Sequence, residues 1–327
     1  MELKLLSKNQ DIQKEWDHFV TSSPSGTLFH KSLWLNAWGG NYDLWGLYKG
    51  AELVAGFVAP YKSLLRMRVV VPPTLTHYSG ILFKKYEGKY VSKITSEKEM
   101  ARELAILVRK KYRRGILSFS PSIDDMQPFI WEGFEVSPMY TYLLDVSDPE
   151  QTLKEMNADT RNSIKKAQND GLSVVVTDSI DEIIELVKKT FMRQGEYPTL
   201  SAAFKYHKEL LRENLYKGFI CVDKDGNKIA TYCIVWDEKR SYGFLSGYDA
   251  KKKHKGATSL CVWEAIKYIS KYLDTIEFDL EGSMIPKIER FNRNFGGKLT
   301  NYYEIKWGWG IDSMTKFRTF CNKYIKV

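Results

Sequence analysis

The sequence predicts an α/β (α+β) protein of two tandem domains, each a mixed, mostly antiparallel sheet flanked by helices. Three observations lead to this prediction. The chain has 327 residues, more than a single hydrophobic core usually serves. Hydrophobic residues make up 43% and aromatic residues 14%, which is enough for packed cores throughout. The same order of strands and helices can also be read twice along the chain.

Hydrophobic periodicity predicts the elements of each half. In the first half, strands are expected at 1–6, 43–48, 52–60, 67–82, 115–120 and 135–146, and helices near 9–21, 31–39, 96–112 and 124–131. In the second half, strands are expected at 172–177, 218–223, 228–237, 241–249, 275–280 and 299–308, and helices near 149–170, 180–195, 200–215, 257–273 and 285–294.

A duplication explains the repeated order, because the apolar pattern of 53–57 is similar to that of 228–232. The turn-forming segment 145–149 precedes a helix and predicts the boundary. The predicted domains are therefore 1–146 and 147–327.

No apolar run in the chain is long enough for a signal sequence or a membrane span, so we expect a cytoplasmic protein without a transmembrane segment. The four cysteines show neither CxxC spacing nor partner histidines at metal-ligand spacing. We expect reduced, mostly buried thiols and no metal site. The oligomeric state is not indicated by any pattern.

The most informative segment for function is 251–260, which reads Lys-Lys-Lys-His-Lys-Gly-Ala-Thr-Ser-Leu between a predicted strand and a predicted helix. Backbone N–H groups, the positive end of the helix dipole and lysine charge meet there, a combination that suits a phosphate or pyrophosphate. The net charge of +9 agrees with an anionic partner, although a solvated lysine-rich surface explains that charge equally well.

With this order and this loop, the chain resembles the GNAT acyltransferase fold, and its tandem arrangement resembles the FemAB-like peptidoglycan amino-acyl transferases and related acetyltransferase-like proteins. The segments that carry the resemblance are 160–171, 251–260, 278–283 and 289–297. It implies two GNAT-like domains. It also implies a splayed strand along which acyl-CoA pantetheine pairs, followed by a loop that holds the pyrophosphate.

The resemblance implies a cofactor site for acyl-CoA or acetyl-CoA in the second domain alone, since the first half has no such loop. Lys253 replaces the Arg or Gln of the family loop, and Thr258 stands where a small residue is usual. The implied site consists of the splayed residues Ser246, Gly247 and Tyr248 and the loop residues Lys253, Lys255, Gly256, Ala257 and Thr258.

Asp279 and Glu281 are the candidate catalytic carboxylates. They lie two positions apart at the end of a strand, so their side chains share a face. Such a carboxylate can act as a general base toward an ammonium group or simply bind it. Alternatively, Glu281 caps the next turn or pairs with Arg290. The resemblance further suggests a tyrosine that protonates the leaving thiolate, and Tyr302 is our candidate.

Four residues are candidates for substrate binding. Arg161 and Lys165, at i and i+4, form a basic helix face that can hold a carboxylate or phosphate. Arg290 lies on a short helix after Pro286. Trp34 fits a tryptophan of the first FemAB-like domain, although Trp38 occupies the position of that family's lysine.

Three functions remain open from the sequence. The first is an N-acyltransferase that moves an acyl group from acyl-CoA to a primary amine of a small molecule or cell-wall precursor. The second is a FemAB-type transferase that uses aminoacyl-tRNA and acts on a peptidoglycan precursor. The third is a degenerate tandem protein that binds an anionic glycan precursor or nucleic acid without catalysis.

Overall fold

The computed structural model describes residues 1–64, 67–193, 200–252, 254–282 and 284–308. It divides into two compact units, one formed by Met1–Met139 with the chain from Asn301, the other by Tyr140–Thr300. The units differ from the predicted domains, because each takes a strand segment from beyond the predicted boundary. We describe each unit by itself.

The first unit contains a mixed sheet in the order β1-β2-β3-β4-β6-β13, with β5 paired to β3. Among the strand pairs of this unit whose register is described, β4 with β6 is parallel and the others are antiparallel. Its elements are β1 (Glu2–Leu5), α1 (Gln10–Ser22), η1 (Leu28–His30), α2 (Ser32–Trp38), β2 (Asn41–Lys49), β3 (Glu52–Leu64), β4 (Met67–Val70), β5 (Gly80–Phe83), α3 (Tyr90–Lys111), β6 (Arg114–Ser118), α4 (Gln127–Trp131), the start of β7 (Glu135–Asp145) and the end of β13 (Lys298–Trp307).

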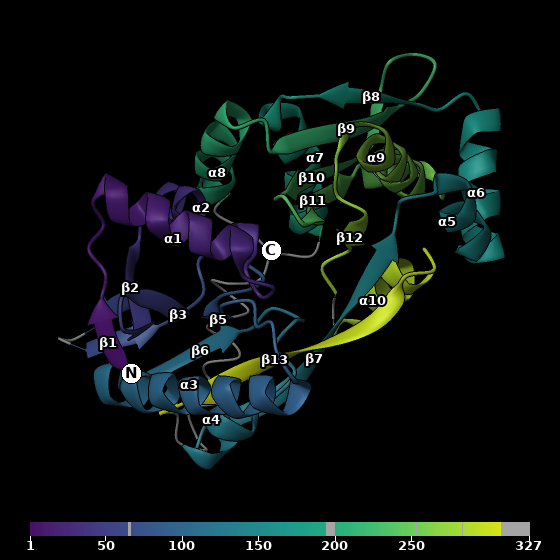
Figure 1. Cartoon of the computed structure of the whole chain (residues 1–327). Helices are drawn as coiled ribbons and strands as arrows, with labels where there is room; N and C mark the ends of the chain where they lie inside the picture. Colours follow the sequence, from purple (N-terminus) through teal and green to yellow (C-terminus); the bar gives the residue numbers. More distant parts are fainter. Residues whose placement is uncertain (65–66, 194–199, 253, 283, 309–327) are drawn as a thin grey trace. The chain divides into compact units, whose positions relative to one another are not determined.

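Helices cover both faces of this first sheet (Figure 1). Trp45 of β2 packs in one buried cluster with Leu104 of α3. Its neighbour Leu44 packs in another with Trp16 of α1 and Leu35 of α2. Because successive strand residues point to opposite faces, the two clusters lie on opposite sides of the sheet.

The second unit contains a sheet in the order β7-β12-β11-β10-β9-β8. All of these pairs are antiparallel except β11 with β12. Its elements are the end of β7, α5 (Pro149–Glu155), α6 (Ala158–Asn169), β8 (Ser173–Thr177), α7 (Ile180–Arg193), α8 (Ser201–Arg212), β9 (Tyr216–Val222), β10 (Lys228–Trp236), β11 (Arg240–Tyr248), η2 (Ala250–Lys252), α9 (Ala257–Tyr272), β12 (Glu277–Asp279), α10 (Pro286–Arg293) and the start of β13.

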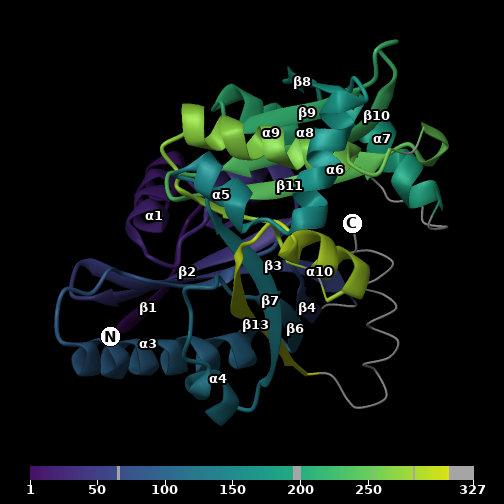
Figure 2. The ribbon, with the colours of Figure 1, turned by 90° about the vertical axis from the view of Figure 1, so that its right-hand side faces the viewer.

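The core of the second unit lies between its sheet and α9, with α5 and α6 beside that helix (Figure 2). Phe219 of β9 and Tyr232 of β10 share this cluster with Ile266 of α9. On the opposite face α7 packs against the strands, and Ile183 lies close to Gly218. The strand order leaves β11 and β12 as neighbours inside the sheet, each with a strand on both sides.

Two predicted elements are each split in the structure. The helix expected at 149–170 becomes α5 and α6, because Asn157 caps a new helix by accepting a hydrogen bond from the Asp159 N–H (2.8 Å). The strand expected at 67–82 becomes β4 and β5, separated by Pro72 and Pro73, which have no N–H to donate to a sheet.

Candidate functional site

Strands β11 and β12 separate after three paired positions. Their parallel pairing runs from Arg240 opposite Glu277 to Tyr242 opposite Asp279, where β12 ends. Strand β11 continues to Tyr248, and the register shift against β10 leaves Phe244 as an extra, bulged residue. Among the described residues, no strand pairs with β11 over 243–248 on the β12 side. This edge can therefore accept an extended ligand through backbone hydrogen bonds.

The three residues predicted for the splayed strand differ in their roles. The Tyr248 N–H donates to Thr190 Oγ1 (2.8 Å), so it points away from β10. Ser246, two positions earlier, directs its N–H to the same side, and its side chain is exposed. Gly247 instead faces α7, where a Cβ atom would lie 2.6 Å from the Val187 nitrogen. Only Ser246 offers its backbone to a ligand by this geometry.

The loop before α9 packs against α6 at Gly256. A Cβ atom on Gly256 would lie 2.0 Å from the Ser163 carbonyl oxygen of α6. The Gly256 N–H donates to His254 Nδ1 (3.2 Å), and the Ala257 N–H donates to the His254 carbonyl (3.2 Å). The predicted phosphate cradle is therefore wrong for these two N–H groups, because both already have acceptors. Lys255 is exposed.

Two further predicted loop residues add little to the geometry. Thr258 is half-buried in the first turn of α9. Lys253 lies outside the described residues.

His254 was not assigned a role from the sequence. Its Nε2 lies 2.9 Å from Asp170 Oδ2, at the C-terminal end of α6. Since Nδ1 accepts from Gly256, Nε2 carries the proton and donates to the carboxylate. The hydrogen bond from His254, followed by that from Lys166, lowers the pKa of Asp170. The histidine thus fixes the loop to α6, a contact that no local sequence signal reveals.

Asp279 and Glu281 occupy different environments. The Asp279 side chain is fully buried and accepts from Thr141 Oγ1 (2.5 Å) and from the Glu281 N–H (2.9 Å). Arg240 Nη1 lies 4.0 Å from its carboxylate. These contacts give Asp279 a structural role, because its oxygens hold β7, β12 and the following turn together, while its catalytic role stays a prediction.

Glu281 lies just beyond the end of β12, where β11 and β12 separate. Its φ of 50° is in the left-handed region, which costs a residue with a Cβ about 1 kcal/mol or more. The side chain is half-buried. The structure therefore places a partly buried carboxylate on a strained backbone beside the open edge of β11.

Tyr232 adjoins this site and was missed by sequence reasoning. A Cβ atom on Gly243 would lie 2.1 Å from the Tyr232 hydroxyl, so the glycine makes room for that group beside the bulge. Burial raises the pKa of Tyr232 well above 10, and the nearby charge of Glu281 adds to the increase. A glycine inside a strand was the available signal, since it often marks such a close approach.

The two predicted basic residues of α6 do not form one binding face. Arg161 Nη1 donates to the carbonyl oxygens of Lys154 (2.9 Å) and Met156, so it joins α5 to α6. These hydrogen bonds give Arg161 a structural role, and its role in substrate recognition stays a prediction. Lys165 is exposed.

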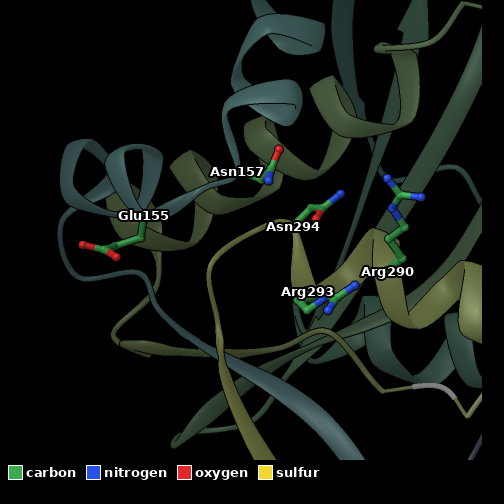
Figure 3. A pocket seen from close by; sticks show the side chains of 5 residues that line it. All are labelled: Glu155, Asn157, Arg290, Arg293 and Asn294. Atoms are coloured by element: carbon green, nitrogen blue, oxygen red, sulfur yellow. The ribbon is translucent and has the colours of Figure 1, made fainter.

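Arg290 lines a hollow of about 500 Å³ beside α10 (Figure 3). The other lining residues are Glu155, Asn157, Arg293 and Asn294, all from the second unit. Sequence reasoning named Arg290 but missed its neighbours, because the α5 to α6 junction lies more than a hundred positions earlier in the chain.

Trp34 and Tyr302 belong to the first unit. The Trp34 side chain is fully buried, its indole N–H donates to Thr76 Oγ1 (2.7 Å), and its ring packs edge-on against Phe29. Tyr302 is also buried and packs edge-on against Tyr78. Both predicted ligand-facing positions are therefore core positions, where aromatic burial accounts for the residue type.

The described residues contain no group of three His, Cys, Asp or Glu side chains that could hold a metal ion. Cys221, Cys233 and Cys261 are buried free thiols, and Cys321 lies outside the described residues. No helix in the described part of the chain combines the length and the apolar character that a bilayer crossing requires.

Residues 154–282 match the family model described as Acetyltransferase (GNAT) domain. This segment falls within the second unit and includes the diverging strands, the loop and Glu281. A sequence comparison with curated proteins gives no match.

Solved structures share the fold over nearly the whole chain. They include FemX (12% identity, TM-score 0.68, covering 97% of this chain and 99% of that chain). The C-terminal domain of a putative lysylphosphatidylglycerol synthetase from Agrobacterium fabrum is also similar (12%, 0.62, 98% and 99%). A third is a tandem GNAT protein from the clavulanic acid biosynthesis pathway (12%, 0.54, 94% and 98%).

Residues 154–282 of the second unit thus match a GNAT domain, and the chain as a whole has the fold of tandem GNAT and FemX-like proteins. The predicted resemblance and fold class are confirmed. The domain match supports a transferase, more narrowly an acyltransferase.

Proposed function

We propose that the second unit transfers an acyl group from an activated carrier to a primary amine. The observation that carries the proposal is the separation of β11 from β12, which leaves 243–248 as an open edge beside Glu281. An extended carrier arm can pair with this edge, and its acyl group then lies near the bulge at Phe244.

Direct transfer requires a deprotonated amine and a stabilised oxyanion. The amine nitrogen attacks the acyl carbonyl, its proton passes to the Glu281 carboxylate, and the carrier leaves with the electrons of the broken bond. Tyr232 supports this role, because its hydroxyl lies at the bulge and its pKa responds to the charge of Glu281. No covalent enzyme intermediate is needed.

For the carrier we propose acyl-CoA. The open edge fits a pantetheine arm, and Ser246 supplies the outward N–H. The fit at the loop is partial, since the N–H groups of Gly256 and Ala257 are already bonded. The exposed side chains of Lys251 and Lys255 remain available for the phosphates, whereas the Lys252 ammonium donates to Asn227 Oδ1 (2.8 Å).

Calorimetric titration with CoA and acetyl-CoA tests this carrier. Ser246→Pro removes the outward N–H without removing a bond to β10, so it should abolish binding while the fold persists. Lys208→Ala, an exposed change on α8, should bind as the parent does. If the parent shows no binding at millimolar CoA, the acyl-CoA carrier is rejected.

A second candidate is a transferase that uses aminoacyl-tRNA. The close contact between Gly256 and the Ser163 carbonyl favours it, because aminoacyl-tRNA needs no pyrophosphate site in this loop. The acceptor would then be a peptidoglycan precursor. This version predicts a mobility shift with charged tRNA that weakens steeply with salt. An absent or salt-insensitive shift would count against it.

The Glu281→Gln variant distinguishes both transferase candidates from a protein that binds its ligand without catalysis. If function in cells survives this change, the catalytic proposal fails. If function is lost while ligand binding persists, catalysis is supported.

A further inference from the structure

We propose that the hollow formed by the α5 to α6 junction and α10 binds a phosphate group of a small-molecule substrate. The inference rests on the proposed transferase and specifies the class of substrate that it takes. The five lining residues are Glu155, Asn157, Arg290, Arg293 and Asn294 (Figure 3).

The charge of the hollow is positive. Arg290 is exposed and makes no ion pair with a described residue, whereas the Arg293 Nε lies 3.3 Å from Glu289. The carboxylate of Glu155, the acidic lining residue, points away from the other four side chains in Figure 3. It accepts a hydrogen bond from Gln151 Nε2 (2.8 Å) on the outer side of α5. An anion therefore meets one guanidinium group, that of Arg290, without an ion-paired acid among the described residues, and a second, that of Arg293, which shares its charge with Glu289.

Two amides add neutral donors to these guanidinium groups. Asn157 uses its Oδ1 to cap α6, which leaves its Nδ2 for a ligand. The Asn157 N–H donates to the Asn294 carbonyl (2.8 Å), so the two residues are held together. Gly296 packs against the Glu155 carbonyl, where a Cβ atom would lie 2.6 Å away. The two walls of the hollow are therefore fixed before a ligand arrives.

The number and direction of these donors favour a phosphate over a carboxylate. A carboxylate is satisfied by one planar, two-pronged donor. Here two guanidinium groups and two amides approach from both walls, which matches the terminal oxygens of a phosphate.

The hollow and the loop before α9 both contact α6. Asn157 caps α6, and Ser163 of the same helix touches Gly256. At 1.5 Å per residue these positions are about 9 Å apart along the helix. A ligand phosphate in the hollow therefore lies within reach of a molecule that also occupies the loop.

Binding is measured by calorimetry at fixed ionic strength for the parent, Arg290→Ala and Lys287→Ala. The lysine change removes one exposed charge from the same helix and serves as the control. The probes are inorganic phosphate, CoA, 3′-dephospho-CoA and uridine diphosphate. We expect Arg290→Ala to weaken phosphate binding about 10-fold or more, while Lys287→Ala leaves it unchanged.

The probes distinguish the source of the phosphate. If Arg290→Ala weakens CoA but not 3′-dephospho-CoA, the hollow holds a phosphate of the carrier. If it weakens uridine diphosphate but not CoA, the hollow holds a phosphorylated acceptor. The parent protein could also bind inorganic phosphate through Arg290 without binding CoA. That result would support the phosphate site in the hollow and reject the acyl-CoA carrier.

The proposal is overturned if both variants bind every probe as the parent does, or if the two changes weaken binding equally. Thermal unfolding of each variant shows whether the fold is retained. Should Arg290→Ala unfold, Asn294→Ala provides the second test, and an unchanged affinity for phosphate there overturns the proposal.

Discussion

The carboxylates of Asp279 and Glu281 have different environments although the sequence predicts the same role for both. The position of Asp279 two residues before Glu281 is visible in the sequence, and both were predicted as catalytic candidates. Thr141, which donates to Asp279, lies 138 positions away, and Arg240 lies on another strand. Sequence reasoning placed the carboxylates at the end of the right strand, but long-range pairing decides which one is engaged.

Replacing Asp279 by Ala should destabilise the protein strongly. The change leaves Thr141 and the Glu281 N–H without their acceptor and removes the charge that faces Arg240. Loss of one partner in such a buried network costs about 3–5 kcal/mol. Urea unfolding of the variant measures this cost. A loss below about 1 kcal/mol would show that Asp279 is not a structural anchor.

Replacing Glu281 by Gln should lower kcat and leave stability nearly unchanged. The amide keeps the shape of the side chain but cannot take a proton, and removing a general base typically costs about 10²–10⁴ in rate. Steady-state kinetics with a primary amine and acyl-CoA gives the comparison. Glu213→Gln, at an exposed carboxylate after α8, is the control. Equal kcat values for parent and Glu281→Gln would exclude this base.

Asp249 should make the loop sensitive to acid. The backbone hydrogen bond from Lys251, followed by that from Lys189, lowers the pKa of Asp249 below its ordinary 3.8. A carboxylate whose pKa is lowered by folding stabilises the protein above its unfolded pKa, and this contribution is lost as pH falls through the folded value. Unfolding below about pH 4 should therefore show a steeper loss of stability for the parent than for Asp249→Asn. Parallel pH profiles would contradict this assignment.

At the scale of elements, the sequence predicts nearly every helix and strand, because alternating and helical apolar patterns report the face that is buried. The strands expected at 218–223 and 228–237 are examples, since they are observed as β9 (Tyr216–Val222) and β10 (Lys228–Trp236). What the pattern cannot show is how two helices meet. The glycine of the loop was interpreted as a phosphate site, but it lies where α6 and α9 touch.

A Cβ atom at Gly256 should separate α6 from α9. Gly256→Ala places that atom against the Ser163 carbonyl, and overpacking of this kind costs about 1–3 kcal/mol. Thermal unfolding compares the variant with Lys255→Ala, an exposed neighbouring change that should be almost neutral. Equal stability of the two variants would mean that the helices do not pack closely here.

At the scale of the whole molecule, the predicted domains meet at 146/147, whereas the compact units meet within β7 and within β13. The end of β7 pairs with β12 in the second unit, with Leu144 opposite Phe278. The end of β13 pairs with β6 in the first unit, with Ile305 opposite Leu117. Periodicity identifies a strand but not its partner, so the sequence could not show that β7 and β13 each contribute to both units.

A fragment of residues 147–327 should fail to fold cooperatively. It lacks the β7 residues that pair with β12 and retains a β13 end whose partner is missing. A fragment of residues 140–300 keeps the second unit intact and should unfold in one transition. Circular dichroism during urea unfolding compares the two. A cooperative transition for 147–327 would show that the end of β7 is dispensable.

The pairing of β13 with β6 also affects how the protein matures on the ribosome. Glu304 lies opposite Ser118, so the first unit binds a segment that is synthesised long after the rest of it. Nascent chains usually complete their N-terminal domains first. Here Tyr140–Thr300 has left the tunnel as a continuous segment before β6 receives its partner. The C-terminal unit can therefore mature first, and the edge of β6 awaits the last strand.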